Sequence, residues 1–175
     1  MDTTKLEIQT ENLLLVSVNL NYKKDIFREL TPGIVKWMTP KSPTIIRETI
    51  QFLRDAIKKN KNGTDFNAVI TLKETGEYLG GCGIHKIKTK FPSLGLWVKK
   101  SAHGNAYGKE AITALKNWAD ENLSYEYINY EAVNINYASR RIPESLGGKV
   151  FKGRKFKNGY DEEFDVIEYR IYPLN

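Results

Sequence analysis

The sequence predicts a single mixed α/β domain, in which helices cover a mostly antiparallel sheet of about seven strands. Apolar strand-like runs alternate with amphipathic helical segments in the order strand, helices, three strands, helix, strand, helix, two strands. A strand, a helix and a strand in succession favour one parallel pair, whereas short turns between the other strands favour antiparallel pairing. The length of 175 residues suits one domain covering residues 1–175.

The N-terminal third is expected to contain one strand and then three helices. The apolar run Leu13–Val16 marks the strand, and apolar residues at three- and four-residue steps mark the longest helix. Thr39–Pro43 carries two prolines and separates the short helix from the long one. We expect the strand at 11–18 and the helices at 19–30, 33–38 and 44–60.

The remainder is expected to contain six strands and two helices. Glu74–Glu77 forms a hairpin turn, and Lys157–Tyr160 forms another near the C-terminus. Gly147 and Gly148 end the second helix. We expect strands at 65–72, 78–87, 93–98, 127–133, 150–156 and 164–172, and helices at 108–123 and 136–146.

The composition is that of a soluble globular protein, with 41% hydrophobic and 27% charged residues. No apolar run is long enough to span a membrane, the N-terminus does not resemble a secretory signal, and the single cysteine, Cys82, excludes an internal disulfide. We therefore expect a cytoplasmic protein. The net charge of +6 suits a partner that carries phosphates. A nucleic acid is not expected to be that partner, because basic and aromatic residues are not interleaved as in RNA-binding modules.

A turn of small residues precedes the helix expected at 108–123. Gly104, Ala106 and Gly108 let the backbone bend and let an anion approach the free N–H groups of the first helical turn. The turn is neither a Walker A loop, which ends in Gly-Lys-Ser/Thr, nor a dinucleotide fingerprint.

This turn and its neighbours resemble the coenzyme-binding segment of the GNAT acetyltransferases. The family loop reads Arg/Gln-x-x-Gly-x-Gly/Ala, and residues 103–108 occupy its six positions, with His103 in place of Arg or Gln and Ala106 in place of Gly. Downstream, Asn136 and Ser139 match the Asn-x-x-Ser of the branch that acetylates ribosomal-protein N-termini. Glu144, Leu146 and Gly147 match its Glu-Lys-Leu-Gly-Phe, from which Ser145 and Gly148 depart.

The resemblance implies a sheet splayed between the strands at 93–98 and 127–133, with the pantetheine arm of acetyl-CoA in the gap. Acetyl-CoA is then the cosubstrate, and no metal is needed. The residues that the resemblance places against the coenzyme are Leu96, Trp97, Val98, His103, Gly104, Asn105, Ala106, Tyr107, Gly108, Lys109, Asn136, Ser139 and Arg141.

The resemblance identifies the catalytic residues less completely than the coenzyme-binding ones. Many relatives protonate the leaving thiolate with a tyrosine, but Pro143 stands at that place, so Ser139 is the expected acid. Ser93 stands where the ribosomal-protein branch often has a glutamate base. His85, Glu131 or a water relay remain as alternatives for the base.

The acceptor is expected to be an amine, with Trp37 and Met38 at the place where the family builds its acceptor pocket. A protein N-terminal amine, such as that of a ribosomal protein, is the first candidate. Polyamines and amino sugars are alternatives, and so is a coenzyme-binding module without turnover. Since dimers are common in this branch, a homodimer is also expected.

Overall fold

The computed structural model describes residues 1–174, which form one eight-stranded sheet with helices on both faces. The helices are α1 (Lys23–Glu29), α2 (Pro32–Val35), α3 (Ile46–Asn62), α4 (Tyr107–Asn122) and α5 (Tyr137–Ser145). The strands are β1 (Glu7–Gln9), β2 (Leu13–Ser17), β3 (Asp65–Leu72), β4 (Tyr78–His85), β5 (Ser93–Val98), β6 (Ile128–Val133), β7 (Lys149–Lys157) and β8 (Glu163–Ile171).

The strand order is β1-β2-β3-β4-β5-β6-β8-β7, and every neighbouring pair is antiparallel except β5 and β6. The mixed fold and the single parallel pair are therefore confirmed. The expected number of strands was one too low, because β1 has three residues and no apolar alternation of its own. Its place at the sheet edge comes from pairing with β2, which sequence periodicity does not reveal.

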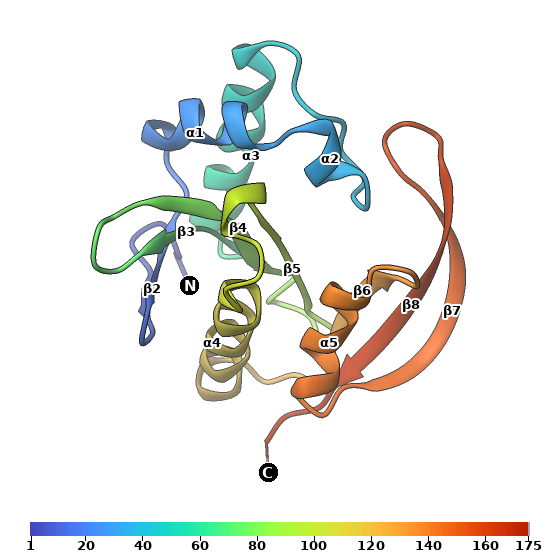
Figure 1. The fold of residues 1–175 in the computed structure, drawn as a ribbon. Coiled ribbons are helices and arrows are strands. Elements are labelled where there is room, and N and C mark those ends of the chain that lie inside the picture. Colours follow the sequence, from blue (N-terminus) through green and yellow to red (C-terminus); the bar gives the residue numbers. More distant parts are fainter. Residues whose placement is uncertain (175) are drawn as a thin grey trace.

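The two faces of the sheet carry different helices. Figure 1 shows α1, α2 and α3 on one side of the sheet and α4 with α5 on the other. Helix α3 begins at Ile46, and its start is capped by Glu48, whose Oε2 accepts a 2.6 Å hydrogen bond from the Thr44 N–H. The helix ends at Asn62, and the next residue, Gly63, adopts the left-handed conformation (φ 63°). Helix α2 is shorter than expected, because the turn before Thr39–Pro43 already begins after Val35.

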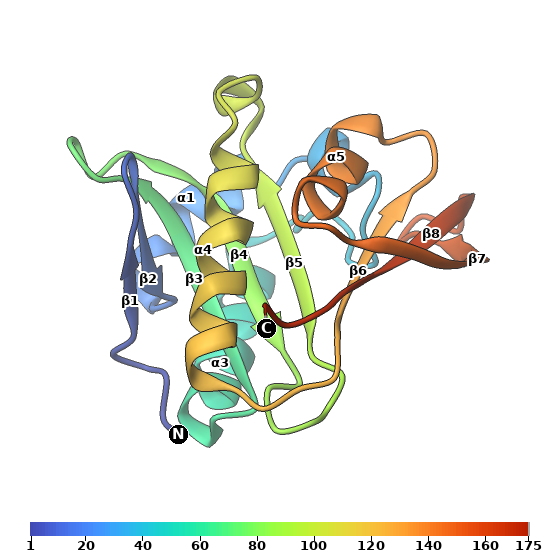
Figure 2. The ribbon, with the colours of Figure 1, turned by 90° about the horizontal axis from the view of Figure 1, so that it is seen from below.

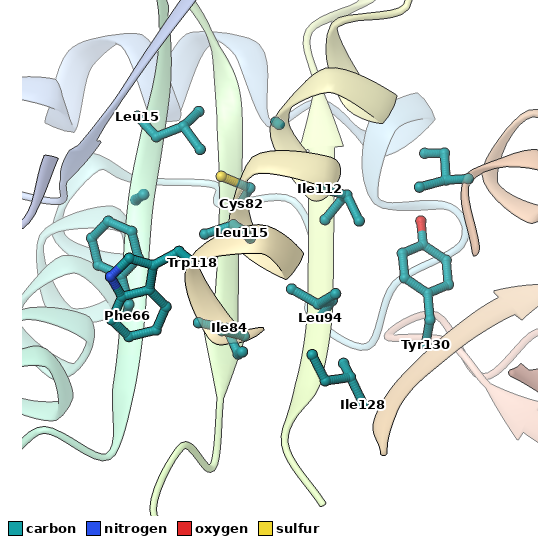
Figure 3. Packing of buried hydrophobic residues seen from close by; sticks show 14 of the residues in the cluster. Leu15, Phe66, Cys82, Ile84, Leu94, Ile112, Leu115, Trp118, Ile128 and Tyr130 are labelled. Atoms are coloured by element: carbon teal, nitrogen blue, oxygen red, sulfur yellow. The ribbon is translucent and has the colours of Figure 1, made fainter. Parts of the chain in front are cut away.

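Each face has its own apolar cluster. On the α4 face, Ile112 and Leu115 lie against Ile84 and Leu94 of the sheet (Figure 3). A second cluster on the other face joins α1 and α3 to the sheet, with Leu53 fully buried in it. Burying an aliphatic side chain of this size contributes about 1.5–3 kcal/mol. The central strands are therefore anchored from both sides.

Over residues 1–174, none of the helices is both long and apolar enough to cross a membrane.

Candidate active site

The most unusual feature of the sheet lies between its two parallel strands. β5 and β6 pair only at Ser93–Asn129 and Leu94–Tyr130, although both strands continue for several residues beyond these pairs. Figure 2 shows the two strands diverging from that point. Within residues 1–174, the later part of β5 is therefore paired with β4 alone.

The backbone groups that face this gap can be identified from the ladder with β4. Residues of an antiparallel strand alternate between bonding the partner and facing away from it. The Lys99 N–H donates to the Leu79 carbonyl at 2.7 Å, so the odd-numbered residues of β5 bond β4. The even-numbered Leu96 and Val98 consequently direct N–H and C=O groups towards β6. The Asn129 N–H, which donates to the Pro92 carbonyl at 2.8 Å, agrees with this alternation.

The turn before α4 presents further backbone donors beside the gap. Gly104 (φ 87°) and Ala106 (φ 60°) both adopt left-handed conformations, and Ala106 is the N-cap of the helix. The first helical hydrogen bond runs from the Glu110 N–H to the Ala106 carbonyl, so the N–H groups just before Glu110 have no partner inside the helix. The Asn105 side chain donates to the Ala102 and His103 carbonyls, which holds the turn in this shape. The result is a cluster of amides suited to an anion.

Gly108 brings three elements together at the gap. A Cβ on this residue would lie 2.7 Å from Leu96 Cδ1 and 3.7 Å from both Val98 Cγ2 and Ile142 Cδ1. The start of α4 therefore approaches β5 and α5 closely because residue 108 has no side chain.

The other residues expected at the coenzyme differ in where their side chains lie. His103 Nε2 lies 2.8 Å from the Val98 carbonyl oxygen, so the imidazole covers one of the acceptors of β5. Tyr107 packs against the apolar cluster on the α4 face, whereas Lys109 and Arg141 have exposed side chains. The side chain of Trp97 points to the opposite face of the sheet, against Tyr78 with ring centroids 6.0 Å apart.

Helix α5 brings a serine and a tyrosine together. Asn136 Oδ1 accepts a hydrogen bond from the Ser139 N–H at 3.3 Å and so caps the helix. Ser139 Oγ lies 3.0 Å from the hydroxyl of Tyr130 on β6. Burial raises the pKa of Tyr130 to about 12, more than the hydrogen bond with Ser139 lowers it, so its hydroxyl stays protonated at neutral pH.

The two candidate bases occupy different environments. His85 Nδ1 lies 3.7 Å from Asp65 Oδ1. Burial lowers the pKa of His85 below its usual value, while the Asp65 charge opposes that shift and Lys59 and Lys86 add to it. The imidazole is therefore mostly neutral at pH 7 and able to accept a proton.

Glu131 is exposed and forms an ion pair with Arg154 of β7, with Arg154 Nε 3.2 Å from Glu131 Oε1. Its carboxylate is therefore already engaged by a guanidinium. His85 also lines a cavity, and Glu131 is not part of the lining of that cavity.

That cavity lies on the α1–α3 side of the sheet and has a volume of about 490 Å³. Its walls include both His85 and the later part of β5, from Gly95 to Trp97. Met38, which was expected at the acceptor, lines it too. Trp37 does not line it, because its ring packs edge-on against Phe164 of β8, with centroids 5.0 Å apart.

Tyr130 and Asp65 also join this arrangement, although no role was expected for either. Tyr130 is on β6 and Asp65 begins β3. The place of Tyr130 on the strand expected to border the gap was a signal for it, whereas Asp65 carried none.

Comparisons with known proteins bear on the family and the fold of the chain. The model of the acetyltransferase (GNAT) domain family matches residues 12–149. A comparison with curated protein sequences finds no match.

Solved structures share the fold over nearly the whole chain. RimL, a ribosomal L7/L12 alpha-N-protein acetyltransferase in complex with coenzyme A, superposes with a TM-score of 0.85 at 16% identity, covering 96% of this chain and 98% of RimL. The microcin C7 self-immunity acetyltransferase MccE, in complex with acetyl-CoA and AMP, gives 0.83 at 15% identity and 93% coverage of both chains. The acetyltransferase from Salmonella typhimurium that modifies the N-terminal serine of L7/L12 gives 0.82 at 16% identity, covering 97% of this chain and 100% of that one.

Proposed function

The chain belongs to the GNAT acetyltransferase family, and we propose that it transfers an acetyl group from acetyl-CoA to a primary amine by direct attack. The observation that carries this proposal is the parting of β5 from β6 beside the amide-rich turn of α4. An arm that bonds like a strand fits the first feature, and a pyrophosphate fits the second.

The residues present fit acetyl-CoA. The backbone groups of Leu96 and the N–H of Val98 are available to the pantetheine arm, and residues 104–108 have amides available to the pyrophosphate. Lys109 follows the turn and Arg141 is on α5. Both side chains are exposed, and they supply positive charge for another phosphate of the coenzyme. When bound, acetyl-CoA supplies a thioester carbonyl that a neutral amine can attack.

His85 is the proposed base, with Asp65 as its positioning residue. The incoming ammonium transfers a proton to His85 Nε2, and the carboxylate beyond Nδ1 stabilises the resulting imidazolium. The Val98 N–H, which faces the gap, donates to the carbonyl oxygen as negative charge develops there. Glu131 is assigned no role, because Arg154 neutralises it.

Ser139 is the proposed proton donor to the departing sulfur. The hydroxyl, which is hydrogen bonded to Tyr130, then regains through water the second proton that the attacking nitrogen loses as the amide forms, so the protons balance. Cys82 is not suited to an acetylated intermediate, because burial raises the pKa of its thiol far above neutrality. This supports transfer directly to the amine.

Two classes of acceptor are supported by different observations. The likeness in fold to RimL and to the Salmonella enzyme supports a protein N-terminal amine, including that of a ribosomal protein. The cavity beside β5, with a volume of about 490 Å³, supports a small amine.

The test is to incubate the purified protein with acetyl-CoA and a broad panel of amines while measuring free thiol. We expect thiol release that depends on the amine and a product heavier by one acetyl group. Saturable binding of acetyl-CoA without release on any amine would contradict the proposed transferase and leave a coenzyme-binding module.

A further inference from the structure

Three glycines line the cavity of about 490 Å³, and they differ in what occupies the space above them. They are Gly81 and Gly83 on β4 and Gly95 on β5. Successive side chains of a strand point to opposite faces of the sheet. Because Leu94 and Leu96 pack in the apolar cluster on the α4 face, position 95 points to the other face, where the cavity lies.

Packing accounts for the two glycines of β4. A Cβ on Gly81 would lie 2.9 Å from Trp97 Nε1, and a Cβ on Gly83 would lie 2.8 Å from the carbonyl oxygen of Phe66 on β3. Neither contact is possible unless something shifts. The indole ring and the neighbouring strand therefore already occupy the space above these two residues.

Packing does not require a glycine at position 95. Leaving aside its chain neighbours, a Cβ here would have one atom of residues 1–174 within 4 Å, His85 Nε2 at 3.8 Å, which is an ordinary van der Waals distance. Gly95 is also not among the glycines with positive φ, so its backbone conformation is open to other residues. A glycine inside a strand weakens the strand, and it often marks a place where a ligand approaches the backbone closely.

The open space above Gly95 lies beside the proposed base. His85 is opposite Ser93 in the ladder, whereas Gly83 is opposite Gly95. His85 Nε2 would lie 3.3 Å from a Cβ on Gly83 and 3.8 Å from one on Gly95, so the imidazole extends from its own position to above this glycine pair. Its other nitrogen, Nδ1, lies 3.7 Å from Asp65 Oδ1. Nε2 is therefore the ring nitrogen that adjoins the space.

The same space adjoins the open part of β5. Leu96 follows Gly95, and its backbone groups are the first to face the gap beyond the β5–β6 pairs. Since consecutive Cα atoms are about 3.8 Å apart, the space is next to the edge proposed for the pantetheine arm. The backbone of Gly95 itself bonds β4, so this residue is not part of that edge.

We propose that the attacking amine occupies the space above Gly95, beside His85 Nε2, and that the missing side chain at position 95 admits the acceptor. A methyl group at this position would stand where the amine has to lie in order to reach both the base and the thioester. The inference rests on the proposed acetyl transfer and states where its acceptor binds.

The experiment measures steady-state kinetics of Gly95→Ala and Gly95→Val with a peptide that begins with serine, with spermidine, with glucosamine and with any further amine that the panel identifies. For each amine that the unaltered protein acetylates, we expect kcat/KM to fall about tenfold in Gly95→Ala and about 100-fold or more in Gly95→Val. KM for acetyl-CoA should not change, because the backbone of residue 95 bonds β4.

Stability separates this role from a structural one. Alanine suits a strand better than glycine does, so the urea midpoint of Gly95→Ala should equal or exceed that of the unaltered protein. Gly153→Ala is the matched control. Gly153 is on β7, and a Cβ there would meet the Val166 carbonyl oxygen at an ordinary 3.7 Å. This variant should leave kcat/KM for the amine unchanged.

Three outcomes would overturn the inference. The first is an unchanged kcat/KM for the amine in both Gly95 variants. The second is a rise in KM for acetyl-CoA that accounts for the whole loss, since residue 95 would then belong to the coenzyme site. The third is a loss of activity in Gly95→Ala that matches a fall in the urea midpoint. Thiol release by the unaltered protein on none of the amines would instead refute the proposed transferase, so the two failures are distinguishable.

Discussion

The two ends of strand β5 differ in what they bond. At Ser93 and Leu94 the strand is paired on both sides, with β4 and with β6. Among residues 1–174, the part from Gly95 to Val98 is paired with β4 alone, and its other edge is directed towards β6. One strand is therefore sheet interior at one end and an open edge at the other.

The difference shows how a stable sheet can offer backbone groups to a ligand. Unpaired strand edges are normally covered or blunted, because they promote aggregation. Here the paired end fixes the position of the open end, and the helices α4 and α5 flank it. The open groups are thus placed in advance of binding, which reduces the entropy lost when a ligand pairs with them.

The largest expected effect comes from placing a proline in each end of β5 in turn. Val98→Pro removes an N–H that faces the gap without removing a bond to β4, so the fold should survive while kcat falls about 100-fold or more. Leu94→Pro is the matched variant. The N–H of residue 94 also faces β6, but Leu94 is 6% exposed and is paired with both β4 and β6. It should lower the urea midpoint strongly or prevent folding. Similar stability and activity in the two variants would refute the contrast.

A somewhat smaller effect on kcat is expected for His85, which lies beside the boundary between the two ends of β5. His85 is opposite Ser93 in the ladder, while its Nε2 would lie 3.8 Å from a Cβ on Gly95. Since a base acts only when neutral, kcat should be constant above the pKa of His85 and fall as the pH drops through it. That acid limb should lie below pH about 6.5, because the pKa of His85 is lowered. His85→Gln should lower kcat about 100-fold at pH 7.5 and abolish the limb.

Asp65→Asn tests the positioning role in the same profile. The Asp65 charge raises the pKa of His85, so its removal should move the acid limb of kcat to lower pH. Asparagine keeps an oxygen that can accept the bond from the Lys86 N–H, which Asp65 Oδ1 accepts at 2.8 Å. A lower kcat with an unmoved limb would indicate a structural role alone.

The smallest expected effect concerns the leaving group, on the β6 side of the gap. Ser139→Ala should lower kcat about tenfold if the hydroxyl protonates the departing sulfur, because water can partly replace it. Ser145→Ala in the same helix is the control, since its Oγ donates only to the Ile142 carbonyl at 2.8 Å. Equal kcat values in the two variants would remove Ser139 from the mechanism.

Much of the fold was accessible from the sequence because its elements carry strong local signals. The bounds 65–72 and 93–98 match β3 and β5 as observed, since apolar residues and flanking turns mark both ends of each. The three-residue β1 was missed, because its pairing with β2 is a tertiary contact. Trp37 was expected at the acceptor and packs instead against Phe164, which is more than 100 residues away in the chain.

What the sequence alone determined is the backbone chemistry of the turn at 103–108. Glycine and alanine at fixed spacing before an amphipathic helix make free amides whatever surrounds them. Only the tertiary structure decided the open edge of β5, the pairs His85–Asp65 and Ser139–Tyr130, and the cavity that His85 lines. The physical reason is that turns and helix ends depend on neighbouring residues, whereas pockets and side-chain pairs depend on packing between distant ones.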